Sequence, residues 1–244
     1  MRVRTDDLVG RVLAISGEYE PNVTAAFRAA LEPGDVCLDI GAHIGYYTVL
    51  AAKALGTACR VYAFEPSPTS YRRLLANAQL NGFENITAVE LAVGEDEGSA
   101  VLYEVPGQNS GMATLHPALA AKSTLPAREV VVAVGPLTSV VPEADLRRVR
   151  VIKIDVEWHE LPVLRSLSPV FDFGAPLSVF VEWTPRQSAP EAADQMRSFC
   201  QRYGFTVYGL GSGHSLERLF PSRVDEPVPL HELPHEQTDL LLVR

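Results

Sequence analysis

Short apolar runs alternate with amphipathic segments from residue 35 onward, and this alternation constrains the fold more than any other feature of the chain. Strands that alternate with helices are typical of a mostly parallel sheet with helices on both faces, so the predicted fold class is α/β. Strands are predicted at 36–40, 61–64, 86–91, 149–156 and 177–183, and helices at 44–55, 66–81, 160–167 and 191–203.

Less regular segments complete the predicted order. An antiparallel extension is expected at 100–105, a short extended run at 130–134, and two further strands at 205–210 and 239–243, which frame a Pro-rich loop at 211–236. Residues 106–128 are too many for a passive connector and are interpreted as a lid or substrate loop. A helical pattern at 24–31 is expected to pack across the sheet. We predict an N-terminal extension at 1–32 and one domain at 33–244.

Composition argues against several classes of function. The 244 residues carry 30 acidic and 21 basic side chains, a formal charge of −9, so no basic face is expected for binding nucleic acid. No run reaches the roughly 18 apolar residues of a membrane span. Cys37, Cys59 and Cys200 form no CxxC pair, so neither zinc nor a disulfide framework is signalled. A soluble, reduced, cytoplasmic protein is the default expectation, and a homo-oligomer stays open.

A glycine turn follows the first predicted strand. The run DIGAHIGYYT at 39–48 leads from Asp39 through Gly41 and Gly45 into a helix. Gly41 is expected to let the backbone approach a ligand, and Gly45 to let the helix pack closely. The dinucleotide fingerprint GxGxxG does not fit, because Asp39 and Ile44 stand where glycines are required. An acidic residue repels a pyrophosphate and suits the ammonium group of S-adenosylmethionine.

The second predicted strand ends in Ala-Phe-Glu-Pro, which puts Glu65 beside the glycine turn. A carboxylate at that strand end can accept hydrogen bonds from both hydroxyls of a ribose. The alternative is a structural crossover with a surface glutamate. Two such features in register with neighbouring strand ends favour a binding site over that alternative.

These segments, with three more, resemble the FkbM-type family of S-adenosylmethionine-dependent methyltransferases. The resemblance implies a class I methyltransferase (Rossmann-like) sheet of seven strands, the last antiparallel, and methyl transfer usually to a hydroxyl. It spans roughly residues 15–185 and is carried by GEYEP at 17–21, PGDVCLDIGAHIGYYT at 33–48, VYAFEPSPTSYRRLLANAQLNG at 61–82, VIKIDVEWHELPVLRSL at 151–167 and VFVEW at 179–183.

The resemblance also implies roles for individual residues. His43 stands where the family usually has Asn, Trp158 replaces the Gly of an EGHE motif, and LTSVV at 137–141 lacks the usual Leu-Asp. We expect the S-adenosylmethionine site to be formed by Asp39, Gly41, His43, Gly45, Glu65, Pro66, Ala92, Val93 and Gly94, the last three next to the adenine.

Polar residues interrupt the predicted strand at 149–156. In an extended chain Asp155, Glu157 and His159 share one face. A hydroxyl is a weak nucleophile until its proton is removed, and histidine is the natural base near neutral pH. We therefore expect His159 to be the general base, with Asp155 and Glu157 orienting it or capping the next helix. A capping or surface imidazole is the alternative for His159.

Two other functions stay open. A metal-assisted methyltransferase would hold a divalent ion on Asp155 and Glu157, with Glu182 as a further ligand, although no metal is expected. A non-catalytic donor-binding module would use the surface of Trp158 for a partner. The expected acceptor is a hydroxyl of a small molecule or glycan, with acceptor-site candidates Tyr19, Glu20, Ser110, Trp158 and Glu182.

Overall fold

The structure is a computed structural model, and it describes residues 1–105, 111, 113–123, 125–184, 191–211, 224–234 and 237–244. The helices are α1 (Leu8–Ser16), α2 (Pro21–Ala30), α3 (Tyr46–Leu55), α4 (Pro68–Leu80), α5 (Pro117–Ala120), the 3-10 turn η2 (Leu137–Ser139), α6 (Glu143–Leu146), α7 (Glu160–Ser166), α8 (Ser168–Asp172) and α9 (Glu191–Tyr203). The strands are β1 (Val36–Ile40), β2 (Arg60–Phe64), β3 (Ile86–Val89), β4 (Ala92–Val93), β5 (Gly98–Glu104), β6 (Arg128–Gly135), β7 (Val149–Ile154), β8 (Ser178–Trp183), β9 (Thr206–Gly209), β10 (Val228–Pro229) and β11 (Thr238–Val243).

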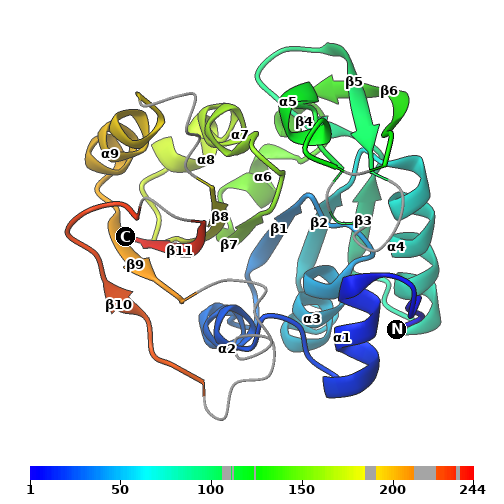
Figure 1. Cartoon of the computed structure of the whole chain (residues 1–244). Coiled ribbons are helices and arrows are strands. Elements are labelled where there is room, and N and C mark those ends of the chain that lie inside the picture. The colour runs from blue at the N-terminus through cyan, green and yellow to red at the C-terminus, as the bar shows by residue number, and fades with distance from the viewer. Residues whose placement is uncertain (106–110, 112, 124, 185–190, 212–223, 235–236) are drawn as a thin grey trace.

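The main sheet has the strand order β10-β9-β11-β8-β7-β1-β2-β3 (Figure 1). β1 pairs in parallel with β2 and β7, whereas β11 runs antiparallel to both of its neighbours, β8 and β9. Seven of these strands form the predicted sheet with its antiparallel last strand. The two-residue strand β10 is an additional edge, inside the segment predicted as a loop.

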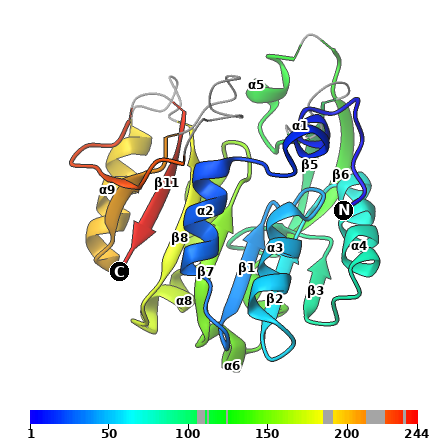
Figure 2. The ribbon, with the colours of Figure 1, turned by 90° about the horizontal axis from the view of Figure 1, so that it is seen from below.

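Helices cover both faces of the sheet, as Figures 1 and 2 show. Side chains alternate along β1, so Val36, Leu38 and Ile40 join the core under α7, α8 and α9, while Cys37 joins the core under α2 and α3. All five residues of β1 are buried, because this strand lies inside the sheet with helices on either side. None of the described helices is long and apolar enough to cross a membrane.

A second, three-stranded sheet has the order β4-β6-β5. β5 pairs antiparallel with β6 over its whole length, which confirms the extension expected at 100–105 and pairs it with the run expected at 130–134. Between them lies α5, and Thr114 forms an isolated antiparallel bridge with Tyr103 of β5. Part of the segment interpreted as a lid, 106–110, 112 and 124, lies outside the described residues.

Two helices form at the N-terminus, of which the sequence pattern predicted one. α2 begins at Pro21 and packs on the sheet, as expected. α1 was not predicted, although its signals are present: the Asp7 carboxylate accepts a hydrogen bond from the Gly10 N–H, and Gly17 ends the helix with φ 74°. The division at residue 32 stays a proposal: α2 shares a core with the sheet, and α1 packs against Ile44 and Tyr46 at the start of α3.

Candidate active site

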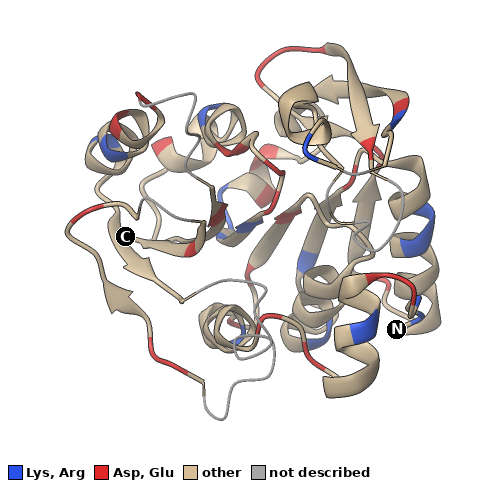
Figure 3. Ribbon diagram, in the orientation of Figure 1, with Lys and Arg blue, Asp and Glu red and all other residues tan. Residues whose placement is uncertain are grey.

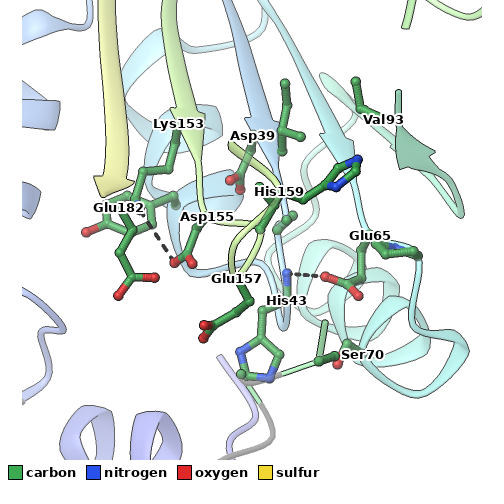
Figure 4. Close-up of a pocket in the computed structure, with 18 of the residues that line it drawn as sticks. Asp39, His43, Glu65, Ser70, Val93, Lys153, Asp155, Glu157, His159 and Glu182 are labelled. Carbon is green, nitrogen blue, oxygen red and sulfur yellow. Dashed lines mark hydrogen bonds and ion pairs between the residues drawn. The ribbon is translucent and has the colours of Figure 1, made fainter. Parts of the chain in front are cut away.

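One pocket opens at the carboxyl ends of β1, β2, β7 and β8 and encloses about 1150 Å³ when its open mouth is included (Figure 4). This is the edge at which open parallel sheets bind ligands. Its lining residues come from a long stretch of the chain, from Val9 of α1 to Glu182 of β8. The expected site residues that line it are Tyr19, Glu20, Asp39, Gly41, His43, Glu65, Pro66, Ala92, Val93, Asp155, Glu157, His159 and Glu182.

The glycine turn after β1 is shaped by contacts within the protein. Gly41 has φ 82°, and a Cβ on it would lie 1.8 Å from the backbone oxygen of Asp155. The expectation that Gly41 makes room for a ligand is therefore incomplete, because a side chain there would first meet the chain leaving β7. Gly45 has φ 85°, and its Cβ would lie 3.1 Å from Leu74 Cδ1, which agrees with the close packing expected of α3.

Glu65 is a fixed carboxylate at the end of β2. It is 5% exposed, and its two oxygens accept hydrogen bonds from the backbone N–H groups of His43, at 2.7 Å, and Ser67, at 2.8 Å. Burial raises the pKa of Glu65 to about 7, and these two hydrogen bonds oppose the rise. His43 supports Glu65 through its backbone at φ 50°, a conformation that Asn and His adopt more readily than most residues.

Asp39 lies near the end of β1, buried beside the glycine turn. The Thr48 hydroxyl of α3 donates to Asp39 Oδ2 at 2.5 Å, which fixes the carboxyl group. Burial raises the pKa of Asp39 to about 6, while the Thr48 hydrogen bond and the Lys153 charge lower it. The side chain is 2% exposed and still borders the pocket.

Apolar residues form the opposite wall. Leu91, Ala92 and Val93 line the pocket together with Leu102 of β5, a surface that suits a flat ring such as adenine. Gly94, which was expected next to these residues, has a different place. Its N–H donates to Gly135, and a Cβ on it would lie 2.7 Å from Val134 Cγ1, so this glycine serves the packing of the second sheet.

Residues 155–158, here called the acidic turn, do not continue the strand. β7 ends at Ile154, and Glu157 and Trp158 both have left-handed backbones, with φ 47° and 77°. The extended chain that would put Asp155, Glu157 and His159 on one face is therefore wrong, because two left-handed residues reverse the chain between them.

The acidic turn instead gathers three carboxyl groups. Oxygens of Asp155, Glu157 and Glu182 lie within 4.8 Å of one another. In Figure 4 the ring of His159 points away from them, toward Val93 and Glu65. Burial, Asp155 and Glu160 raise the pKa of Glu157 to about 8. Burial raises the pKa of Glu182 well above its ordinary value, with Asp155 and Glu157 adding to the rise.

Lys153 is a site residue that sequence reasoning missed. It is 1% exposed, its Nζ lies 3.5 Å from Asp155 Oδ2, and it sits 5.2 Å from the ring centroid of Tyr47. Burial by itself would lower the pKa of Lys153. The charges of Asp155, Glu20 and other carboxylates outweigh this effect and raise the pKa above its ordinary value, so the ammonium stays charged. Burial would raise the pKa of Asp155, and Lys153 leads the groups that bring it below its ordinary value. A lysine inside the apolar run VRVIKI was the available signal.

Of the remaining candidates for the acceptor site, Tyr19 and Glu20 line the pocket and Trp158 does not. Glu20 Oε2 accepts a hydrogen bond from the Tyr47 hydroxyl at 2.8 Å, and Tyr19 beside it is buried. Trp158 is 8% exposed and packs under Lys122, whose Nζ lies 4.3 Å from the ring centroid. Ser110 lies outside the described residues.

The strand order, the single antiparallel strand among the seven and the carboxylates at the ends of β1 and β2 match the fold of class I S-adenosylmethionine-dependent methyltransferases. The fold matches the methyltransferase FkbM of Methylobacillus flagellatus KT, with a TM-score of 0.51, 14% identity and coverage of 96% of this chain and 52% of that one. It also matches an S-adenosylmethionine-dependent O-methyltransferase of Thermotoga maritima, with a TM-score of 0.51, 12% identity and coverage of 98% and 71%. Residues 39–207 match the methyltransferase FkbM domain, and the chain belongs to this family.

Curated relatives match over part of their length. The chain is 28% identical to the 31-O-demethyl-FK506 methyltransferase FkbM of Streptomyces tacrolimicus, covering 56% of this chain and 61% of that one. It is 26% identical to the hexuronic acid methyltransferase AglP of Haloferax volcanii, covering 68% and 63%. The chain thus spans about three fifths of the length of these relatives.

Proposed function

We propose that this chain transfers the methyl group of S-adenosylmethionine to a hydroxyl of a small-molecule or glycan acceptor. One observation carries the proposal: a fixed carboxylate of the kind that binds a ribose, Glu65, shares a pocket with the ionisable groups of the acidic turn. The names of two relatives, a 31-O-demethyl-FK506 methyltransferase and a hexuronic acid methyltransferase, support small-molecule and sugar acceptors.

The residues present fit the methyl donor chemically. Glu65 would accept the ribose hydroxyls, and the apolar wall of Leu91, Ala92 and Val93 would face the adenine. Asp39 and Glu20 would face the cationic end of the donor. When bound, S-adenosylmethionine supplies an electrophilic methyl group on a sulfonium.

Two residues are candidates for the base that removes the acceptor proton. His159, expected from the sequence, lines the pocket and stands at the N-cap position, directly before α7. Glu157 lies with Asp155 and Glu182 on the side of the pocket away from the apolar wall. A carboxylate whose pKa is raised to about 8 is a stronger base than an ordinary one, so we favour Glu157.

The test of the proposed function combines binding and turnover. Mass spectrometry of the purified protein should detect bound S-adenosylmethionine or S-adenosylhomocysteine. Transfer of a labelled methyl group should then be measured over a panel of sugars, macrolides and other alcohols. Label found on nitrogen or carbon of the product would contradict oxygen as the acceptor, and failure to bind the donor would contradict the proposal as a whole.

A metal-assisted reaction is the second candidate, favoured by the clustered oxygens of Asp155, Glu157 and Glu182. A divalent ion there would polarise the acceptor hydroxyl. The Lys153 ammonium already lies 3.5 Å from Asp155 and would repel the ion, so we place this candidate second.

A non-catalytic binding module is less well supported. The Trp158 ring is buried under Lys122 and offers little surface to a partner. Figure 3 shows Lys and Arg spread over separate helices and strands, which supports our proposal that the acceptor is not a nucleic acid. The three cysteines are free and buried, in keeping with the proposed cytoplasmic location.

A further inference from the structure

Residues 113–115 form a segment with two faces, here called the strap. Ala113 and Leu115 line the pocket and pack against the cluster of Ala92 and Leu102, part of the apolar wall that would face the adenine. Thr114 between them is 1% exposed, and its hydroxyl donates to the backbone oxygen of Glu157 at 2.7 Å. The same hydroxyl accepts a hydrogen bond from the His116 N–H at 3.0 Å. The strap therefore joins the donor pocket to the acidic turn.

The strap is itself held in place. Thr114 exchanges two backbone hydrogen bonds with Tyr103, of 2.8 and 3.2 Å, which fix it to β5. Leu102, the neighbour of Tyr103 in β5, also lines the pocket. A ligand in the donor half of the pocket would thus touch both sides of this bridge.

The acidic turn depends on partners outside itself. Two consecutive left-handed residues other than glycine are strained, so the conformation persists only where neighbours hold it. Glu160 Oε1, at the start of α7, accepts a hydrogen bond from the Trp158 N–H at 2.8 Å. Two further contacts come from the chain between β5 and β6: the Thr114 hydroxyl on the Glu157 carbonyl, and the Lys122 ammonium over the Trp158 ring.

We propose that Thr114 is a positioning residue that couples donor binding to the geometry of the acidic turn. A donor packed against Ala113 and Leu115 holds the strap still, and Thr114 then holds the Glu157 carbonyl. The Glu157 carboxyl group is thereby kept beside Asp155 and Glu182 once the donor is bound, which favours binding of donor before acceptor. This inference rests on the donor half of the proposed function and not on the identity of the acceptor.

The experiment is hydrogen exchange with mass spectrometry on the full chain, with and without saturating S-adenosylhomocysteine. Thr114→Val removes the hydroxyl at nearly constant volume, Thr114→Ser keeps it, and Thr206→Val is a control at an exposed strand position. In the parent, Thr114→Ser and Thr206→Val, the ligand should slow exchange at 156–160 by about tenfold or more. That factor corresponds to the cost of leaving the buried Glu157 carbonyl without its hydrogen bond, which the bound ligand makes harder to break. In Thr114→Val the ligand should still protect 113–115 but no longer protect 156–160.

A second variant covers the case in which Thr114→Val does not fold. Lys122→Met removes the exposed ammonium from the Trp158 ring, leaves Thr114 in place, and should reduce the ligand-dependent protection of 156–160 by about threefold. Full protection of 156–160 in Thr114→Val, or in Lys122→Met where Thr114→Val does not fold, would overturn the coupling while leaving the methyltransferase proposal intact. No binding of S-adenosylhomocysteine to the parent, measured by calorimetry, would overturn both.

Discussion

At the scale of single residues, Trp158 has a backbone conformation that glycine adopts freely. Its φ of 77° costs a side-chain-bearing residue about 1–2 kcal/mol. Replacing the buried ring by either Ala or Gly should lower the free energy of unfolding by roughly 2–5 kcal/mol. Trp158→Gly should nevertheless be more stable than Trp158→Ala by up to about 1 kcal/mol, after the greater freedom of unfolded glycine is allowed for.

Urea denaturation of the two Trp158 variants checks this order. Alanine is normally the more stabilising of the two residues, so the inverted order is a specific sign of the left-handed conformation. Equal stabilities, or a more stable Ala variant, would mean that the turn relaxes once the ring is removed.

Glu157 and His159 make a second comparison at the residue scale. If Glu157 is the base, Glu157→Gln should lower kcat by about 10²–10⁴-fold, whereas His159→Ala should keep much of the parent rate. A base acts when deprotonated, so kcat/KM of the parent should rise with pH and level off above about 8, the raised pKa of Glu157. Initial rates of both variants across pH 6–9 decide between them, and an active Glu157→Gln with a dead His159→Ala would assign the role to His159.

At the scale of elements, the close approach of the chain leaving β1 to the chain leaving β7 depends on Gly41. A Cβ on Gly41 would lie 1.8 Å from a backbone oxygen, whereas one on Gly45 would lie 3.1 Å from the end of the Leu74 side chain. Both glycines have φ above 80°, so backbone strain is nearly the same for the two. Gly41→Ala should therefore lose at least about 2 kcal/mol more stability than Gly45→Ala, as overpacking against backbone does. Thermal and urea unfolding of the two variants measure the difference, and equal losses of stability would count against this close approach of Gly41 to the Asp155 backbone.

The same scale shows what could be predicted from the sequence. Strongly patterned elements lie where expected: α9 buries residues at helical spacing, and β1 is a short, fully buried run, mostly apolar. α1 was missed although Asp7 and Gly17 mark its ends, and β10 is too short for a pattern to indicate. The acidic turn could not be predicted, because Glu157 and Trp158 are not residue types that signal a left-handed backbone. The place of Glu65 beside the glycine turn follows from the sequence, whereas the direction of the His159 side chain does not, because the acidic turn decides where His159 points.

At the scale of the whole molecule, buried carboxyl groups make stability depend on pH. The pKa values of Asp39, Glu65 and Glu157 are raised to about 6, 7 and 8, from 3.8 and 4.5 for ordinary Asp and Glu, so the folded state holds more protons than the unfolded state across this range. Their contribution to stability is fully present below about pH 4 and is lost as the pH rises through 6 to 8.

The ligand-free protein should therefore melt at progressively lower temperature between pH 5 and pH 8. S-adenosylmethionine should offset part of that decline, because its cationic group and hydroxyls favour the ionised carboxylates. Differential scanning calorimetry at constant ionic strength, with and without the donor, measures both effects. Glu65→Gln is the matched variant, and a melting temperature that rises with pH in the parent would contradict the raised pKa values.

Chelation tests the reaction of the whole enzyme. We expect turnover to survive EDTA, since Lys153 already supplies a positive charge beside Asp155. Methyl transfer should be measured after dialysis against the chelator and again after magnesium or manganese is added back. Activity that disappears and returns with the ion would favour the metal-assisted reaction, with Asp155, Glu157 and Glu182 as its ligands.

The position of β11 has a consequence for the protein while it is being synthesised. β8 and β9 follow each other among the strands of the main sheet in chain order, yet they are not neighbours, because β11 lies between them and pairs with both. Until residues 238–243 leave the ribosome, the edge of β8 has no strand to pair with, and its backbone N–H and C=O groups stay open to pairing with other nascent chains. A ribosome that stalls in the preceding loop would thus hold a sheet that ends at an unpaired β8 edge, to which a chaperone could bind.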